Sequence, residues 1–205
     1  MKKRGQKICI ICEGFEEHDY IQALINKSIF SNEYNFTPIN VKSINNIVPV
    51  YQEKFMSDSY FIVLIFCDTD RGPSEKYLKI KNEINTFHDS NIADEIIIFG
   101  NPCTMQIVLS HFGKVRLTSQ NKSINSKPIE ELTGISNYKA SSEQRKELFG
   151  KINRANYEVM KENINELSTS DKDTSSTNFL KFITYFESDD ISWIDNINDK
   201  LYGKE

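Results

Sequence analysis

The sequence predicts an α/β fold in which helices flank a mostly parallel sheet. Over the first half of the chain, short apolar runs typical of buried strands alternate with amphipathic segments at helical spacing. The run over residues 60–67 is apolar throughout, as central strands are when helices cover both faces of a parallel sheet. Alternating strands and helices imply right-handed crossovers, so we expect consecutive strands to run in the same direction.

Four strands and the helices between them follow in order. Strands are expected over residues 7–12, 36–44, 60–67 and 95–99. Helices are expected over residues 16–29, 47–56 and 74–88, with Pro49 in a first turn, where proline is tolerated. The inward side chains expected in the first of these helices are Tyr20, Ile21, Leu24, Ile25 and Ile29, and those in the third are Tyr77, Leu78, Ile80, Ile84 and Phe87.

Beyond the fourth strand, helices and polar connections are expected. Asn101-Pro102-Cys103 is a typical start for an apolar helix, which we expect to end at Phe112. The polar residues 118–127 predict a loop. A second helical region follows, which Ser141 and Gln144 open as a capping box. Its apolar positions at helical spacing are Leu148, Ile152, Ala155, Val159 and Met160.

The end of the chain predicts a linker and one more helix. Residues 168–177 consist almost entirely of Ser, Thr and Asp, a composition typical of a flexible linker. We therefore expect a main domain over residues 1–115 and a helical C-terminal extension over residues 116–205. The last amphipathic helix is indicated by Phe179, Leu180, Phe182, Ile183 and Phe186.

Composition bounds the function. A net charge of −4 and a pI near 5.5 exclude a broadly basic nucleic-acid binder, although bound divalent metal can still bring phosphate in. No apolar run approaches the roughly 18 residues of a membrane span, and the first is too short for a signal peptide. The cysteines, which lie in or beside apolar runs, predict structural thiols in a reducing cytoplasm, and strand alternation points two of them to opposite faces. They are Cys9, Cys12, Cys67 and Cys103.

Four carboxylates follow two of the expected strands. Glu13 and Glu17 come after the first strand, and Asp68 and Asp70 after the third. Ligands of open α/β sheets bind beyond the carboxyl ends of the strands, and Asp68 and Asp70 should point to the same side if that segment is extended. Converging carboxylates would repel one another by several kcal/mol, and a bound Mg²⁺ or Mn²⁺ is the simplest resolution. Such ions support phosphodiester hydrolysis, so the pattern indicates a metal-dependent nuclease.

A structural interpretation competes at each position. An Asp after a buried strand is common as a cap, and a Glu in the first turn of a helix complements its dipole. We keep this interpretation for Glu16 and Asp19. The full pattern is harder to explain in this way, because it would require unrelated caps at two neighbouring strand ends.

Three further side chains are candidates for contacting substrate. His111, in the apolar helix, suits a phosphate donor or general acid, and the competing interpretation is a satisfied buried histidine. Lys114 and Arg116 suit phosphate contacts or, equally, the C-terminal end of a helix dipole. No P-loop, GxGxxG motif or Ser/His/Asp arrangement is present, so any ATP hydrolysis belongs to a partner.

These motifs together carry a family resemblance. Residues 13–17 (EGFEE) after one strand and residues 68–70 (DTD) after another resemble the Toprim signature of topoisomerases, primases and OLD-type nucleases. Asn101-Pro102-Cys103 with the following segment to Phe112, and the stretch Ser176-Thr177-Asn178, resemble segments of the RloB-like Toprim proteins. The resemblance implies a Rossmann-like Toprim domain over residues 1–115.

The resemblance also implies a function and its residues. It carries over Glu13, Asp68 and Asp70 as ligands of Mg²⁺ or Mn²⁺, with Glu17 as a further carboxylate, and the family's longer first loop leaves open whether Glu16 or Glu17 is the second acid. It implies a cytoplasmic nuclease of DNA or RNA that acts in abortive infection against phage beside an ABC-type ATPase, with self-association left open. The alternatives are a non-catalytic regulatory Toprim module and a receiver-like phosphorelay domain.

Overall fold

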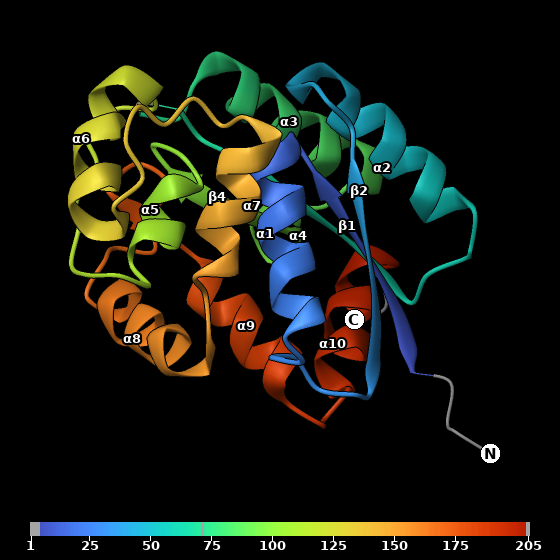
Figure 1. The fold of residues 1–205 in the computed structure, drawn as a ribbon. Coiled ribbons are helices and arrows are strands. Elements are labelled where there is room, and N and C mark those ends of the chain that lie inside the picture. Colours follow the sequence, from blue (N-terminus) through green and yellow to red (C-terminus); the bar gives the residue numbers. More distant parts are fainter. Residues whose placement is uncertain (1–4, 71, 204–205) are drawn as a thin grey trace.

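Five strands form one sheet at the centre of the protein (Figure 1). The computed structural model describes residues 5–70 and 72–203. The strand order is β2-β1-β3-β4-β5, in which the first four strands are parallel and β5 runs antiparallel to β4. The predicted α/β fold with a mostly parallel sheet is confirmed. The strands are β1 (Gln6–Cys12), β2 (Tyr34–Asn40), β3 (Ile62–Asp68), β4 (Ile97–Asn101) and β5 (Ser176–Thr177).

Ten α-helices and one short 3-10 helix are assigned within the described residues. Several begin where the sequence supplies a cap, as at Ser74, whose hydroxyl accepts a hydrogen bond from the Tyr77 backbone N–H. They are α1 (Phe15–Asn26), η1 (Ile44–Asn46), α2 (Ile47–Met56), α3 (Glu75–His88), α4 (Ala93–Ile96), α5 (Met105–Leu109), α6 (Lys122–Thr133), α7 (Ser142–Gly150), α8 (Arg154–Asn165), α9 (Phe179–Glu187) and α10 (Ser192–Leu201).

Helices cover both faces of the sheet, as the apolar β3 sequence requires. Phe179 of α9 stacks on Phe66 of β3 and also contacts Tyr20 of α1, so α1 and α9 share one face. Tyr77 of α3 packs against Phe99 of β4 on the opposite face, because Phe99 follows the strand position that pairs with Phe66. Figure 1 shows α1 in front of the sheet, with α2 and α3 behind it. One hydrophobic cluster joins these layers.

The segment over residues 168–177 is not the flexible linker that its composition predicts. Its side chains at Asp171 and Ser176 are buried, and its end forms β5 beside β4. The Asn101 amide donates to the carbonyls of Asp171 and Asp173 at 2.8 and 2.9 Å. Because β5 pairs with only two residues of β4, polar side chains of this region supply further hydrogen bonds at that side of the strand. The expected C-terminal extension, residues 116–205, thus supplies a strand to the sheet as well as helices.

Other elements differ from the expectation in extent. The expected loop at residues 118–127 contains the start of α6, which Asn121 caps by accepting from the Ser123 amide. The apolar helix expected to begin at Asn101 and end at Phe112 is only α5, because Asn101 still belongs to β4.

The region after Ser141 is two helices rather than one. Residues 151–153 separate α7 from α8, and Asn153 caps α8. Ser141 accepts from the Gln144 amide as predicted, but the Gln144 side chain accepts from Lys139 instead of closing the box.

The burial of some side chains also differs from the expectation. Leu78 and Val159, expected to point inward, are exposed. The amphipathic helix α10 was not predicted, although its buried Trp193 and Ile197 have helical spacing. All four cysteines are free and buried, as expected for structural thiols. Within the described ranges, no helix is long and apolar enough to cross a membrane.

Candidate functional site

Two neighbouring strands bring Glu13 and Asp68 together. β1 pairs with β3 so that Cys12 lies beside Phe66, and both strands end at the same edge of the sheet. The Asp68 backbone N–H donates to Glu13 Oε2 at 3.2 Å, and the Glu13 N–H donates to the Phe66 carbonyl at 3.0 Å. The expectation that these residues would meet at the carboxyl edge therefore agrees with the geometry.

Glu17 completes what we call the acidic cluster, which consists of Glu13, Glu17 and Asp68. Glu17 lies in the first turn of α1 and is only 5% exposed. Its Oε2 accepts a hydrogen bond of 2.9 Å from the backbone N–H of Gly14, the residue that precedes the helix. The turn between β1 and α1 thus delivers a second carboxylate from the same short segment.

The surroundings of the acidic cluster disfavour the ionised form of its carboxyl groups. Burial and the nearby Glu17 raise the pKa of Glu13 to about 7. Burial raises the pKa of Asp68 well above its usual range, and the charges of Glu17 and Glu13 raise it further. The pKa of Glu17 is also raised, by burial first and then by Glu16. The electrostatic cost of three ionised groups is thus built into this edge of the sheet.

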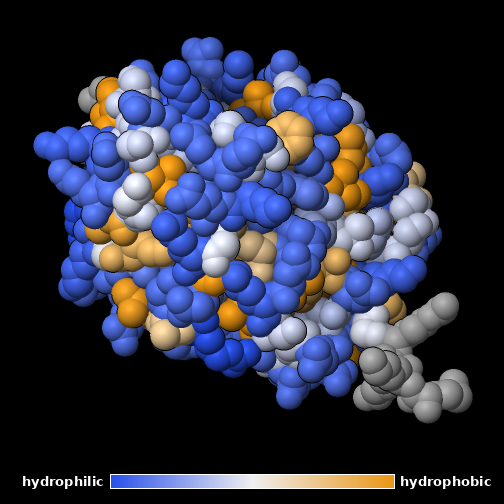
Figure 2. Space-filling view, in the orientation of Figure 1, coloured by the Kyte–Doolittle hydropathy of each residue, from blue (hydrophilic) through white to orange (hydrophobic). Residues whose placement is uncertain are grey.

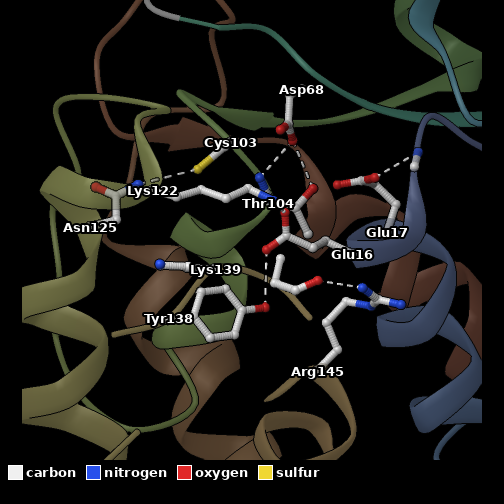
Figure 3. Close-up of polar contacts among 12 residues, drawn as sticks. Glu16, Glu17, Asp68, Cys103, Thr104, Lys122, Asn125, Tyr138, Lys139 and Arg145 are labelled. Atoms are coloured by element: carbon white, nitrogen blue, oxygen red, sulfur yellow. Dashed lines mark hydrogen bonds and ion pairs between the residues drawn. The ribbon is translucent and has the colours of Figure 1, made fainter. Parts of the chain in front are cut away.

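Thr104 is a partner of Asp68 that the sequence interpretation missed. Its backbone N–H and its hydroxyl both donate to Asp68 Oδ1, at 2.7 and 2.8 Å. Figure 3 shows both bonds converging on the carboxylate. Thr104 lies just beyond β4, the next strand to β3, so its proximity to Asp68 follows once the strand order is known. The two bonds leave Oδ2 as the carboxylate oxygen without a hydrogen bond from a described residue.

Glu16 lies beside the acidic cluster but has partners of its own. Its Oε2 lies 2.7 Å from the Lys122 ammonium, and its Oε1 accepts from the Tyr138 hydroxyl at 3.1 Å (Figure 3). These contacts fit the structural interpretation of Glu16. Of the two candidates for the second acid, Glu17 is the one whose charge acts most strongly on Asp68. Asp19 likewise has a structural partner, since its Oδ2 lies 2.8 Å from Arg145 Nε.

Asp70 does not follow the extended geometry expected of it. β3 ends at Asp68, and Asp70 adopts a left-handed backbone conformation with φ of 60°. The argument that Asp68 and Asp70 share a side because the segment is extended is therefore wrong. The Asp70 charge still contributes to the raised pKa of Glu13, so the two residues lie near each other.

The carboxylate oxygens of Glu13 and Asp68 are the atoms that could bind a metal ion. Glu13 uses Oε2 and Asp68 uses Oδ1 for hydrogen bonds, so Glu13 Oε1 and Asp68 Oδ2 accept none from the described residues. Carboxylate oxygens are the ligands that Mg²⁺ prefers, and a cation would offset the repulsion in the cluster. In residues 5–70 and 72–203, no group of three His, Cys, Asp or Glu side chains is already arranged around one point. The chemistry of the donors fits a divalent cation, although the side chains are not arranged around one point in this structure.

A small cavity lies beside the acidic cluster. It has a volume of about 30 Å³, enough for an ion or a water molecule but not for a nucleotide. Helix α6 and the chain before it form part of its wall. Its lining includes Glu16, Asp68, Thr104, Lys122 and Tyr138.

The three expected substrate residues lie apart from this cavity. His111 is 1% exposed, and its Nε2 lies 2.9 Å from the Tyr20 hydroxyl. Burial lowers its pKa to about 4, which keeps the ring neutral. These features fit the interpretation of His111 as a buried structural histidine, with one ring nitrogen bonded and Nδ1 without a partner among the described residues. Lys114 forms an ion pair with Glu166, and Arg116 donates to the Glu166 carbonyl at 3.3 Å, so both cations contact the C-terminal end of α8.

Comparison with known proteins adds no assignment. No family model matches this chain, and neither a curated protein nor a solved structure is significantly similar to it. The resemblance to RloB-like Toprim proteins, with the function it implies, stays a prediction.

Proposed function

We propose that this protein is a divalent-metal-dependent nuclease that hydrolyses phosphodiester bonds in DNA or RNA at the acidic cluster. The observation that carries the proposal is the raised pKa of Glu13, Glu17 and Asp68 together at the carboxyl edge of a parallel sheet. Structural carboxylates normally have partners that favour their charge, whereas these three disfavour one another. Perturbed groups at a ligand-binding edge are candidates for chemistry.

Glu13 and Asp68 are the residues proposed to hold Mg²⁺ or Mn²⁺, with Asp70 as a further ligand from the adjacent turn. Such an ion, when bound, neutralises phosphoryl oxygens and activates water. Thr104 orients Asp68, because its two hydrogen bonds fix Oδ1 and leave Oδ2 without a hydrogen bond from a described residue.

The wider role is proposed from the resemblance alone. RloB-like Toprim proteins act in phage defence beside an ABC-type ATPase, and this chain carries their motifs at Glu13, Asp68, Asn101 and Asn178. We propose the same role here, in the cytoplasm, with the ATPase as a separate chain.

The test is a cleavage assay with the purified protein, alone and with any ATPase encoded beside its gene. Plasmid DNA and total tRNA are incubated with Mg²⁺ or Mn²⁺, and products are resolved on gels. We expect cleavage by the wild type and a loss of at least about a hundredfold in Asp68→Ala, as when a group that stabilises transition-state charge is removed. Asp94→Ala, an exposed surface aspartate, should cleave normally.

Thermal melting of each variant separates loss of chemistry from loss of fold. Cleavage by Asp68→Ala at the wild-type rate would contradict the proposal. Absence of cleavage by the wild type under every combination would instead favour a non-catalytic regulatory module.

A further inference from the structure

Phe15 is an exposed aromatic side chain at the edge of the sheet that carries the acidic cluster. It is 51% exposed and follows Glu13 and Gly14 directly, as the first residue of α1. The other exposed aromatic side chains among the described residues are Phe61 and Tyr202. Phe61 precedes β3 and so lies at the amino edge, and Tyr202 stacks on Phe55. The ring is apolar, accessible to solvent and adjacent in the chain to the acidic cluster, so it is a candidate contact for a ligand.

The Phe15 ring is held in position from one side. The Arg145 guanidinium carbon lies 4.8 Å from the ring centroid, the geometry of a cation–π contact. Arg145 is itself fixed, because it is 8% exposed and binds Asp19 and the Ala140 carbonyl. A ring that is already ordered loses little freedom when a ligand stacks on it. With Arg145 on one side, the exposed surface of the ring is available to a ligand.

Cationic side chains lie on the same rim. The Lys122 side chain is 51% exposed beside Glu16, the residue after Phe15, and exposed Lys139 follows Tyr138 (Figure 3). The face of the protein in Figure 2 is largely hydrophilic, with small separate apolar patches. The cavity beside Asp68, of about 30 Å³, is too small for a nucleotide, so a nucleic-acid substrate would contact the protein outside it, where Phe15, Lys122 and Lys139 are exposed.

We propose that Phe15 is a stacking platform for an unpaired base, and that the substrate is therefore single-stranded nucleic acid. The inference rests on the proposed nuclease function and specifies its substrate class. Aromatic side chains next to cations bind single strands in this way, because every base has a flat face that stacks. In a duplex the base faces are already stacked on one another, so Phe15 would have little to bind.

The test measures binding without cleavage. Fluorescence anisotropy follows the full-length protein binding to labelled oligothymidylate, oligouridylate and a mixed-sequence duplex in the presence of chelator. We expect Phe15→Ala to bind both single strands about 5- to 100-fold more weakly than the wild type, the range for loss of one stacked base. Phe15→Trp should restore binding. Phe61→Ala, which removes an equally exposed ring from the opposite edge, should bind as the wild type does.

The outcomes separate the inference from the proposed function. Wild-type cleavage together with unchanged single-strand binding by Phe15→Ala would overturn only the stacking role. Equal weakening for single strands and duplex would also overturn it, because a general surface effect does not depend on free base faces. If the wild type binds and cleaves no nucleic acid, both proposals are wrong. Melting curves should show Phe15→Ala folded, since its ring contributes little to the core.

Discussion

One aspartate from each of two polar regions, the acidic cluster and the segment beside β4 (residues 168–178), shows how the two regions differ. Asp68, in the acidic cluster, has Glu13 and Glu17 as its nearest charges, and both oppose its ionisation. Asp171, in the segment beside β4, is 9% exposed and lies 2.6 Å from the Lys81 ammonium. The same residue type thus meets opposite electrostatic environments within one sheet.

This contrast separates polar groups that stabilise the fold from polar groups that do not. In the segment beside β4, side chains complete the hydrogen bonds of an edge strand: Asn178 donates to the Ile97 carbonyl at 2.7 Å and accepts from the Phe99 amide at 2.9 Å. Thr177 donates to the Phe99 carbonyl at 2.6 Å. The carboxylates of the acidic cluster accept hydrogen bonds from Gly14, Asp68 and Thr104, but none of them forms an ion pair with a described residue. Burial without an opposite charge is a reason to propose function, and burial with compensating partners is a reason to propose stability.

The largest effect on stability is expected from Asn178→Ala. The substitution leaves an N–H and a carbonyl of β4 unpaired in a buried setting, at about 1 to 3 kcal/mol each, so we expect a loss of roughly 2 to 6 kcal/mol. Urea denaturation followed by circular dichroism measures it. Asn196→Ala, at an exposed position of α10, serves as the control and should change stability by less than about 0.5 kcal/mol. A loss as small as this for Asn178→Ala would show that the segment does not hold β4.

A buried histidine sharpens the comparison through pH. His111 has a folded-state pKa of about 4, below the value of about 6.5 in the unfolded chain, so the unfolded state binds its proton first. Stability from this group is fully present above about pH 6.5 and is lost as the pH falls toward 4, by about 3 kcal/mol in total. The raised pKa of Glu13 acts in the opposite sense, since its folded state gains stability on acidification from about pH 7.

The measurement compares urea denaturation of the wild type and His111→Gln between pH 7 and pH 4. Glutamine can still bond to the Tyr20 hydroxyl but does not titrate, so the variant should lose less stability on acidification. Parallel curves for the two proteins would show that His111 titrates normally.

The smallest change in the free energy of unfolding is expected from a matched pair of aspartate substitutions. Asp68→Asn keeps the acceptor for Thr104 and removes a repelled charge, so we expect a gain of about 1 kcal/mol at pH 8 in chelator. Asp171→Asn removes the more buried of the two carboxylates that pair with Lys81, the other being Asp94, and should lose about 1 to 2 kcal/mol. Thermal melts with and without Mg²⁺ extend the test, because the ion should raise the melting temperature of the wild type much more than that of Asp68→Asn. Changes of the same sign in both variants would contradict the contrast between the two regions.

Local pattern was enough for much of the fold. The helix expected over residues 47–56 is α2 with the same ends, and the strand expected over residues 7–12 is β1 with one more residue. The helix has apolar side chains at helical spacing, and the strand is a short continuous apolar run, which is typical of a strand buried on both faces. The segment over residues 168–177 misled the same reasoning, because composition reports how soluble a segment is and not whether an open strand edge lies nearby.

The α/β class, the buried strands and the placement of Glu13 and Asp68 at strand ends could all be predicted from the sequence alone. Each of them follows from the pattern of apolar and polar residues along a short stretch of chain. Only the tertiary structure decided that Glu17 rather than Glu16 faces Asp68, that Thr104 orients it, and that Asp70 turns away from the extended path. These outcomes depend on which strands are neighbours and on how one turn bends, and contacts between residues far apart in the chain leave no period in the sequence. Electrostatic cost likewise arises only when separate segments meet, so the raised pKa of the acidic cluster is a property of the folded protein.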